Sequence, residues 1–285
     1  MSFDPRITPA RGDLAAKRLE GLVEAGRFVE GQTRQVIEAQ APLRRSRAPD
    51  APLDTEALRG ERVVIYEDDD EGWSWGELQG DGYVGYLPQQ ALAPVGPAPT
   101  HRIAALRTFV FPGPSIKLPP LMALSFGSRV TVERFDLGFG WLAAGGCIPS
   151  QHLAFADTTE PDFVAVAEKF LGVPYLWGGK TSLGLDCSAL VQLALTAAGT
   201  ACPRDSDMQE QALGNPLDDP GAAKKYQRGD LIFWKGHVAI VRDDTTLLHA
   251  NAYHMAVAVE PTIDAIRRIA ETGGKVTSVR RPARG

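Results

Sequence analysis

A glycine-rich loop that runs directly into a helix, at residues 175–199, constrains the fold of this chain more than any other feature. Residues 175–185 are typical of a loop. From Ser188 to Ala198, apolar side chains recur every three or four residues, which predicts a helix that Gly199 ends. Cys187 stands at the junction, where unpaired N–H groups and the helix dipole stabilise an anion. We therefore expect a thiol that ionises readily, and the alternative is a small buried cysteine that packs the start of the helix.

Composition excludes several classes of function. The net charge is −5 and basic residues form no block, so the sequence does not predict a nucleic-acid partner. No apolar run is long enough to span a membrane, and residues 1–13 lack the apolar core of a secretory signal, so we expect a cytoplasmic protein. The odd set Cys147, Cys187 and Cys202 predicts neither a disulfide framework nor a zinc site.

At 285 residues the chain is long enough for more than one domain. Short strand-like runs with turn residues between them, at 62–66, 72–78 and 83–87, predict a small all-β barrel. A weaker copy at 106–111, 129–133, 140–143 and 147–149 indicates an internal repeat of about 60 residues. The predicted domains are an N-terminal arm at 1–35, a first barrel at 36–98, a second barrel at 99–157 and a last domain at 158–285.

The first copy carries Gly-Trp at 72–73 and Asp-Gly-Tyr-Val-Gly-Tyr-Leu at 81–87, and it resembles bacterial SH3-like barrels. The second copy lacks this motif and has Ala144-Gly-Gly-Cys-Ile instead, so its assignment depends on order and spacing. Such barrels often precede cell-wall hydrolase domains. The three tryptophans Trp73, Trp75 and Trp141 are expected mostly in barrel cores.

In the last domain, the sequence predicts helices followed by an antiparallel meander, and this order is typical of an α+β fold. Thr159 is a candidate N-cap for a first helix that has Pro161 in its first turn. Four strand-like runs follow the Cys187 helix, at 229–234, 237–241, 247–250 and 256–259. A last helix around 263–270 and a strand at 276–279 complete the expected domain.

A nucleophilic thiolate needs a neighbouring base. His237 begins one predicted strand, and His249 lies on the next one. Whether they share a face depends on the loop between the strands. A three-residue loop at 243–245 pairs Ala239 with His249 and places the two histidines on one face as diagonal neighbours. A two-residue loop places them on opposite faces and breaks the site.

Taken together, these motifs resemble the NlpC-type papain-like cysteine peptidases. The resemblance covers Pro174-Tyr-x-Trp-Gly-Gly, Leu-Asp-Cys187-Ser-Ala-Leu-Val, Gly-Asp-Leu-Ile-Phe-Trp, His237-Val-Ala-Ile-Val and Leu-Leu-His249-Ala, in this order. It departs at Ala189, where the family usually has glycine. It implies that Cys187 is the nucleophile, His237 the general base and acid, and His249 the orienting third member. Tyr175 and the Cys187 N–H would stabilise the oxyanion.

The resemblance also implies substrate contacts. In members with N-terminal barrels that act on free muropeptides, the segment matching 203–209 binds substrate, which assigns Asp205 and Ser206 to the free α-amino end. Tyr83 of the first barrel would wall the cleft and select a free N-terminal L-Ala. An acidic partner for Tyr83 is not evident at 49–54, where it would fall. The remaining implied contacts are Asp186, Ser188 and Trp177. Loop packing is the alternative for both Trp177 and Tyr175.

The fold expected from these signals is α+β: a papain-like catalytic domain with an antiparallel sheet, preceded by two small all-β SH3-like barrels. The resemblance implies a cysteine peptidase that cleaves the γ-D-glutamyl-diamino acid bond of murein tri- or tetrapeptides and releases L-Ala-D-Glu, without metal or cofactor. Two alternatives stay open. One is a secreted or injected hydrolase of intact wall, and the other is a non-catalytic module that binds wall peptides.

Overall fold

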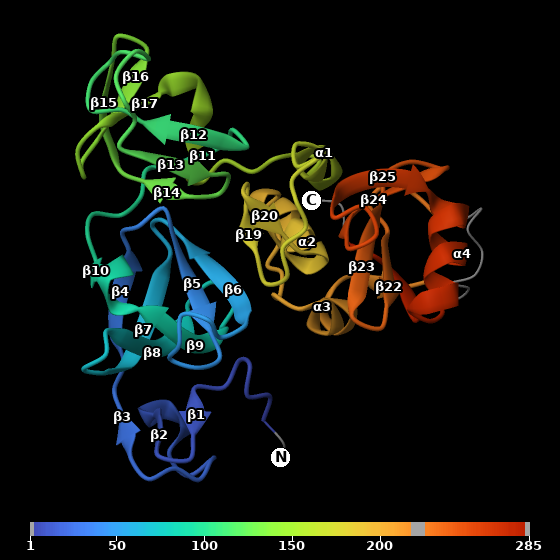
Figure 1. Cartoon of the computed structure of the whole chain (residues 1–285), viewed down its shortest axis with the longest axis horizontal. Coiled ribbons are helices and arrows are strands. Elements are labelled where there is room, and N and C mark those ends of the chain that lie inside the picture. The colour runs from blue at the N-terminus through green and yellow to red at the C-terminus, as the bar shows by residue number, and fades with distance from the viewer. Residues whose placement is uncertain (1–2, 218–225, 283–285) are drawn as a thin grey trace. The chain divides into compact units, whose positions relative to one another are not determined.

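The computed structural model describes residues 3–217 and 226–282, and the chain forms two compact units that divide between Thr158 and Thr159 (Figure 1). The N-terminal unit is built from β-strands with three short 3-10 helices. The C-terminal unit combines helices with an antiparallel sheet. Among the described residues, no helix combines the length and apolar character that a membrane crossing requires.

The first barrel is a seven-stranded sheet with the strand order β10-β4-β7-β8-β9-β5-β6. Its interior is filled by alternating apolar side chains such as Leu43, Val63 and Leu87, which are fully buried. Gly76 lies where a Cβ would meet the Val64 carbonyl at 2.3 Å, so this crossing of strands requires glycine. The elements are β4 (Gln32–Val36), β5 (Gln40–Arg44), β6 (Leu53–Leu58), β7 (Arg62–Asp68), β8 (Trp73–Leu78), β9 (Val84–Pro88), η2 (Gln89–Ala91) and β10 (Leu92–Pro94).

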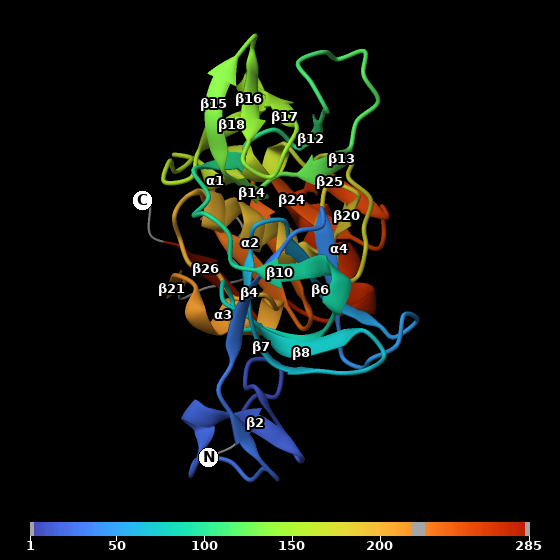
Figure 2. The ribbon, with the colours of Figure 1, turned by 90° about the vertical axis from the view of Figure 1, so that its left-hand side faces the viewer.

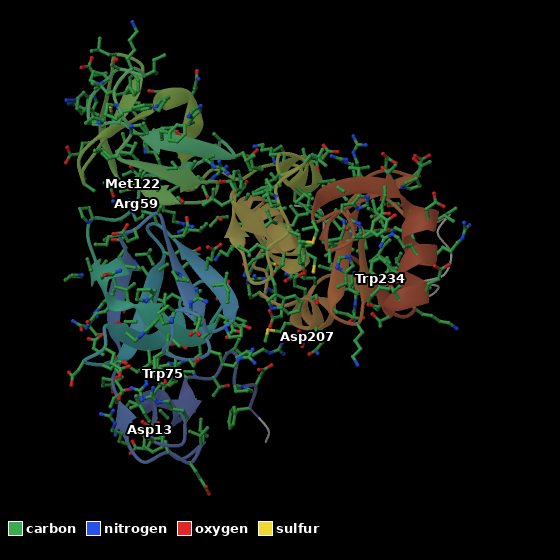
Figure 3. The ribbon with its side chains drawn as sticks, in the orientation of Figure 1. Asp13, Arg59, Trp75, Met122, Asp207 and Trp234 are labelled. Atoms are coloured by element: carbon green, nitrogen blue, oxygen red, sulfur yellow. The ribbon has the colours of Figure 1, made fainter. Side chains whose placement is uncertain are left out.

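The N-terminal arm is shorter than predicted and contains strands. β1 (Ala10–Arg11), β2 (Leu14–Ala16), η1 (Lys17–Leu19) and β3 (Phe28–Val29) form a small sheet with one 3-10 turn. Its apolar residues Leu14 and Leu19 share a core with Tyr66 and Trp75 of the first barrel, and Figure 3 labels Trp75 there. The predicted boundary at residue 35 is wrong by a few residues, because β4 already pairs with β7 from Gln32.

The second barrel repeats the end of the first. η2 and β10 follow Pro88, and η3 (Ser150–His152) and β18 (Leu153–Phe155) follow Pro149 in the same way. β15 (Val132–Asp136) and β16 (Phe139–Leu142) run side by side as an antiparallel pair (Figure 2). The end of the predicted repeat is therefore present in the backbone, whereas the strands before it form separate small sheets and not one seven-stranded sheet. The other strands are β11 (His101–Ile103), β12 (Arg107–Val110), β13 (Met122–Ser125), β14 (Arg129–Val130) and β17 (Cys147–Pro149).

The prediction for the tryptophans is confirmed for Trp75, which is 4% exposed and supports an Arg11 guanidinium 4.6 Å from its ring centroid. Trp73 and Trp141 are only half-buried. Arg134 covers the Trp141 ring at 4.2 Å. A barrel wall one sheet thick leaves such rings at its rim, so period-two alternation alone overstated their burial.

The C-terminal unit begins with α1 (Phe163–Glu168). The predicted N-cap Thr159 is wrong. Asp162 caps this helix, and its carboxylate accepts hydrogen bonds from the N–H groups of Val164 and Ala165. The hairpin β19 (Lys180–Thr181) and β20 (Gly184–Leu185) then leads into α2 (Cys187–Ala197), which is almost completely buried and is followed by α3 (Ser206–Ala212).

A six-stranded antiparallel sheet of order β21-β26-β22-β23-β24-β25 forms the second half of this unit. α2 packs against β23 and β24. On the face covered by α4, Trp234, Val241 and Leu247 pack with Ala265 of the helix, and Figure 3 labels Trp234 at this position. The elements are β21 (Asn215–Pro216), β22 (Leu231–Trp234), β23 (His237–Val241), β24 (Thr246–Asn251), β25 (Ala256–Pro261), α4 (Thr262–Thr272) and β26 (Ser278–Arg281).

Candidate active site

The loop before Cys187 is shaped by its glycines. Gly178 has φ +76°, which favours glycine, and its N–H donates to the Asp186 carboxylate at 3.0 Å. A Cβ on Gly179 would lie 2.5 Å from the Gly184 carbonyl oxygen, so the hairpin closes only with glycine there. The Gly-Gly pair therefore brings the loop back onto the residue that precedes the cysteine.

Asp186 is the N-cap of helix α2, and its Oδ1 accepts the Ala189 N–H at 2.8 Å. This cap begins the helix at Cys187, one residue before the predicted start at Ser188. The N–H of Cys187 heads the helix and has no preceding helical carbonyl to bond within it. Cys187 itself is 6% exposed. One cap therefore holds both the thiol of Cys187 and a backbone N–H that is free to donate outside the helix.

Behind the cap lies a buried ion pair. Arg204 is 1% exposed and donates to both oxygens of Asp186, at 2.9 and 2.7 Å. It also donates to the Ser188 hydroxyl at 2.9 Å and to the Gly179 carbonyl at 3.3 Å. Burial of such a charge requires this pairing. We name Asp186, Ser188 and Arg204 the cap network.

The cap network corrects two substrate contacts implied by the resemblance. Both Asp186 oxygens are used inside the protein, and Ser188 is 5% exposed with its hydroxyl bonded to Asp186 and Arg204. These side chains hold the cysteine loop and have no carboxylate or hydroxyl turned to a ligand. The motif around Cys187 implied substrate contacts for Asp186 and Ser188. Spacing along the sequence does not show that Arg204 is the partner of the Asp186 carboxylate.

The two histidines meet as the three-residue loop predicts. In the antiparallel pair of β23 and β24, Val241 lies opposite Leu247 and Ile240 lies opposite Leu248. The same register places Ala239 opposite His249. His237 Nε2 lies 2.8 Å from His249 Nδ1, and the ring centroids are 5.0 Å apart. Of the two, His237 is half-buried and His249 is 1% exposed. The outer ring can therefore reach a substrate while the inner one cannot.

Sequence reasoning missed the partner behind His249. Glu260 Oε1 lies 2.6 Å from His249 Nε2, and Arg268 of α4 donates to the same oxygen at 2.5 Å. The register pairs Glu260 with Leu247, two residues from His249, so both side chains share one face. The sequence did contain a signal, because Glu260 stands at the end of the predicted strand that follows the strand of His249. We name His237, His249, Glu260 and Arg268 the histidine chain.

The sulfur of Cys187 lies against the beginning of β23. Burial, followed by the charge of Asp186, raises the pKa of the Cys187 thiol to about 12, although the N–H groups of Val238 and Ser188 and the charge of Arg204 act in the opposite direction. Val238 follows His237, so the sulfur lies at the strand end that bears the outer histidine. The expectation of an easily ionised thiol is wrong, because desolvation outweighs the helix terminus.

The histidines are also kept neutral. Burial, and after it the neighbouring His249, lowers the pKa of His237 to about 3. Burial likewise lowers the pKa of His249, although the Glu260 carboxylate acts to raise it. Near neutral pH the Cys187 thiol and both imidazoles are therefore uncharged. An uncharged thiol can act as a nucleophile only if its proton is transferred to a base during the attack.

Tyr175 lies where the loop pairs with two strands. Its N–H donates to the Met255 carbonyl at 2.9 Å, and it bridges to Leu185 in parallel. Burial, then the neighbouring Cys187, raises the pKa of the Tyr175 phenol, which stays protonated and can donate. The structure thus brings Tyr175, Cys187 and the histidines into one region of this unit.

The other predicted contacts differ in exposure. Trp177 is 68% exposed, so the alternative that it packs the loop is wrong. Asp205 is half-buried at the N-terminus of α3 and makes no capping hydrogen bond, whereas Ser206 is 8% exposed. Tyr83 is 4% exposed in the core of the first barrel, which corrects its expected role as a cleft wall.

One cluster in the described part of the chain could offer metal ligands: His249, His254 and Glu260, whose ligand atoms lie within 4.8 Å of one another. Glu260 is already paired with the Arg268 cation, and His254 Nδ1 lies 3.0 Å from Asn251 Oδ1. A guanidinium on the shared carboxylate opposes a metal ion at this point. The arrangement fits hydrogen bonding between side chains better than metal binding.

Comparisons with known proteins agree with this geometry. The model of the NlpC/P60 family matches residues 172–267, and the model of the bacterial dipeptidyl-peptidase SH3 domain matches residues 43–92. Dipeptidyl-peptidase 6 of Lysinibacillus sphaericus is 38% identical over 102 residues, which are 36% of each chain. The γ-D-glutamyl-L-lysine dipeptidyl-peptidase of Bacillus cereus is 25% identical over 244 residues, which are 73% of this chain and 70% of that protein.

A further relative, the γ-D-glutamyl-L-lysine dipeptidyl-peptidase of Bacillus subtilis, is 38% identical over 101 residues, 32% of each chain. The chain thus spans about a third of the length of two of these three relatives. Among solved structures, an NlpC/P60 family protein from Bacillus cereus aligns with a TM-score of 0.72 at 21% identity, over 88% of this chain and 99% of that one. The fold is therefore the papain-like fold of this family, and the chain carries an NlpC/P60 peptidase domain preceded by a bacterial SH3-like domain.

Proposed function

We propose that this protein is a cysteine peptidase that hydrolyses the γ-D-glutamyl-diamino acid bond of murein peptides with a free N-terminal L-Ala. The observation that carries the proposal is the meeting of Cys187, at the start of α2, with the strand end that bears His237 and its 2.8 Å contact to His249. The names of two relatives, γ-D-glutamyl-L-lysine dipeptidyl-peptidases, support the choice of bond.

In the first half of the proposed reaction, the Cys187 thiol passes its proton to His237 as the sulfur attacks the scissile carbonyl. The Cys187 N–H and the Tyr175 hydroxyl donate to the oxyanion that forms. His237 then protonates the amine of the diamino acid, which leaves. The product of this half is a thioester between Cys187 and L-Ala-γ-D-Glu.

In the second half, water attacks the thioester, and His237 accepts the proton of that water. Collapse of the second tetrahedral intermediate breaks the C–S bond, releases the dipeptide as its γ-carboxylic acid and returns the proton to the sulfur. His249 remains neutral throughout, and its own Nδ1 accepts the hydrogen bond from His237 that holds the His237 ring in place. No step of this route uses a metal ion or an organic cofactor.

Asp205 is the proposed partner of the substrate's α-ammonium group. It follows Arg204, whose guanidinium bonds the residue before Cys187, so its backbone is tied to the nucleophile loop. Asp205→Asn should raise KM for the free-amine peptide about 10- to 100-fold, the range expected from loss of one charge-assisted hydrogen bond. The same change should leave KM for the N-acetylated peptide unaltered, and an equal rise for both peptides would contradict the assignment.

The proposal as a whole is tested with L-Ala-γ-D-Glu-diaminopimelate, its lysine analogue, and the N-acetylated form of each. Release of L-Ala-D-Glu should be seen by mass spectrometry with the native chain and be absent with Cys187→Ala. Failure to cleave any of the four peptides would refute it. Release of peptides from intact sacculi at a comparable rate would favour the wall hydrolase. The cytoplasmic location stays a prediction that cell fractionation can test.

A further inference from the structure

The histidine chain continues beyond the three residues that the proposed mechanism uses. His249 is 1% exposed, and its Nε2 lies 2.6 Å from a Glu260 oxygen whose side chain is 11% exposed. Arg268 reaches the same oxygen from α4 at 2.5 Å. Removing a carboxylate even largely from water is costly, and here two donors compensate that cost.

From this geometry we infer that Glu260 is a positioning residue of the site: it sets the proton position on His249 and, through it, the nitrogen that His237 presents to Cys187. The inference deepens the proposed function and rests on it for its catalytic consequence. Glu260 contacts neither the nucleophile nor a substrate in this assignment and acts through the two rings.

The argument follows the donors and acceptors along the chain. An ionised carboxylate only accepts hydrogen bonds, so the proton of the 2.6 Å contact belongs to His249 Nε2. A neutral ring with its proton on Nε2 has a lone pair on Nδ1. That lone pair accepts from His237 Nε2 at 2.8 Å, which must then carry the proton of His237. The nitrogen left with a lone pair on His237 is Nδ1, the atom available to the thiol.

Each premise has its own support. Burial acts to raise the pKa of Glu260, but hydrogen bonds from His249 and Arg268 outweigh it and bring the pKa below its ordinary value, so the carboxylate is ionised. Both rings are neutral near pH 7, because burial lowers the pKa of each. With a neutral ring and an acceptor-only neighbour, a single proton arrangement satisfies both contacts.

Arg268 fixes the carboxylate in place. Its guanidinium lies 4.2 Å from the centroid of the Tyr253 ring and so is held between an aromatic face and Glu260. The side chains of Arg268 and Glu260 are 25% and 11% exposed, so both are partly withdrawn from water. The proton position on His249 is thus set by an ion pair that bridges α4 and β25.

The test compares Glu260→Gln and Glu260→Leu with Glu271→Leu, a control that changes an exposed glutamate on α4, the helix that bears Arg268. The Leu variant at 260 removes the acceptor and should lower kcat about 10- to 100-fold, as loss of a partner that orients a histidine does elsewhere. The Gln variant keeps a carbonyl acceptor and should fall between it and the native chain. The control should stay within about twofold, and KM should be unchanged in all.

A second readout needs no substrate. Nitrogen-15 NMR of histidine-labelled Cys187→Ala protein should show both His237 and His249 protonated on Nε2 near neutral pH. In the Cys187→Ala, Glu260→Leu double variant, His249 should gain a population protonated on Nδ1, and His237 should lose its acceptor. Where Glu260→Leu impairs folding, Glu260→Leu with Arg268→Met removes the unpaired cation and allows the same measurement.

Outcomes separate this inference from the proposed function. An Nε2 proton on His249 that persists in Glu260→Leu, or an unaltered kcat in that variant, overturns the role of Glu260. Native protein that cleaves none of the murein peptides but shows the expected change in tautomer refutes the proposed substrate and leaves the positioning role standing. In that case, the alkylation rate of Cys187 in Glu260→Leu replaces kcat as the measure, with a decrease expected and no change counting against the inference.

Discussion

Two ionic networks support the candidate site: the cap network lies behind Cys187, and the histidine chain extends behind His237. In the cap network, Arg204 and Asp186 use their hydrogen-bonding capacity on the backbone and on Ser188. In the histidine chain, Glu260 and Arg268 form an equally close pair, but one that ends on a titratable ring facing another. The first network can only hold a shape, whereas the second also decides where a proton lies.

The largest expected effect sharpens this contrast. His237→Ala removes the general base and should lower kcat/KM about 10²- to 10⁴-fold, the usual contribution of a positioned acid-base group. The midpoint of thermal unfolding should stay close to that of the native chain, because the ring is half-buried at a strand end. His152→Ala in the second barrel is the control. A parallel loss of stability would mean that the histidine chain is also a structural network.

In the cap network, a substitution should reduce the stability of the fold, whereas His237→Ala reduces activity. Arg204→Met leaves the Asp186 carboxylate buried without its cation and should lower the free energy of unfolding by about 3–5 kcal/mol. Arg228→Met, at an exposed pair with Asp162, should cost no more than about 1 kcal/mol. Urea unfolding measures both. If Asp186→Leu combined with Arg204→Met is no more stable than Arg204→Met alone, the buried charge is not the cause.

Alkylation tests the protonation state of the resting site. With the pKa of Cys187 raised to about 12 by burial, its rate of reaction with iodoacetamide should rise about tenfold per pH unit from neutral into the alkaline range. A preformed thiolate-imidazolium pair would instead give a rate that is flat across neutral pH. Mass spectrometry of the peptides that contain Cys147, Cys187 and Cys202 identifies the labelled site. A rate at Cys187 that does not change with pH would mean that the thiol is already ionised at neutral pH, as its place at the helix N-terminus suggested.

The smallest effect concerns stability in acid. The folded pKa of His237 lies below the value of 6.5 for an unperturbed ring, so the unfolded chain binds more protons between about pH 3 and 6.5. The stability that the neutral ring contributes is complete above this window and is lost as pH falls through it, by at most about 1.4 kcal/mol per pH unit. His237→Asn should therefore show a weaker decrease in unfolding free energy between neutral pH and about pH 5. Equal slopes for the two proteins would contradict the depressed pKa.

The elements of the catalytic unit could be predicted because their signals are local. The helix that starts at Cys187 follows from apolar spacing, and the partner strands of His237 and His249 follow from alternation and a loop whose length sets the register. Where a residue's role depends on a distant partner, prediction failed. Asp186 resembled a cleft wall until Arg204, eighteen positions along the chain, was placed against it.

Burial was the other property that local patterns missed. Helix-terminus chemistry suggested a thiolate at Cys187, but desolvation reverses the direction of its pKa. Tyr83 lies in a motif typical of a ligand-binding barrel, yet its ring fills the barrel core. Both errors arise because periodicity reports which face of an element is apolar and not how much of the chain eventually covers it.

By itself, the sequence determined the α+β order and the place of Cys187 at a helix start, because each depends on residues close together along the chain. For the two histidines it reduced the question to the length of one loop, which the structure shows to be three residues. Only the tertiary structure decided which carboxylates are held by Arg204 and Arg268, and thus which proton sits where. Hydrogen bonds between side chains far apart in sequence act over about 3 Å, and only the packed fold brings their partners within that distance.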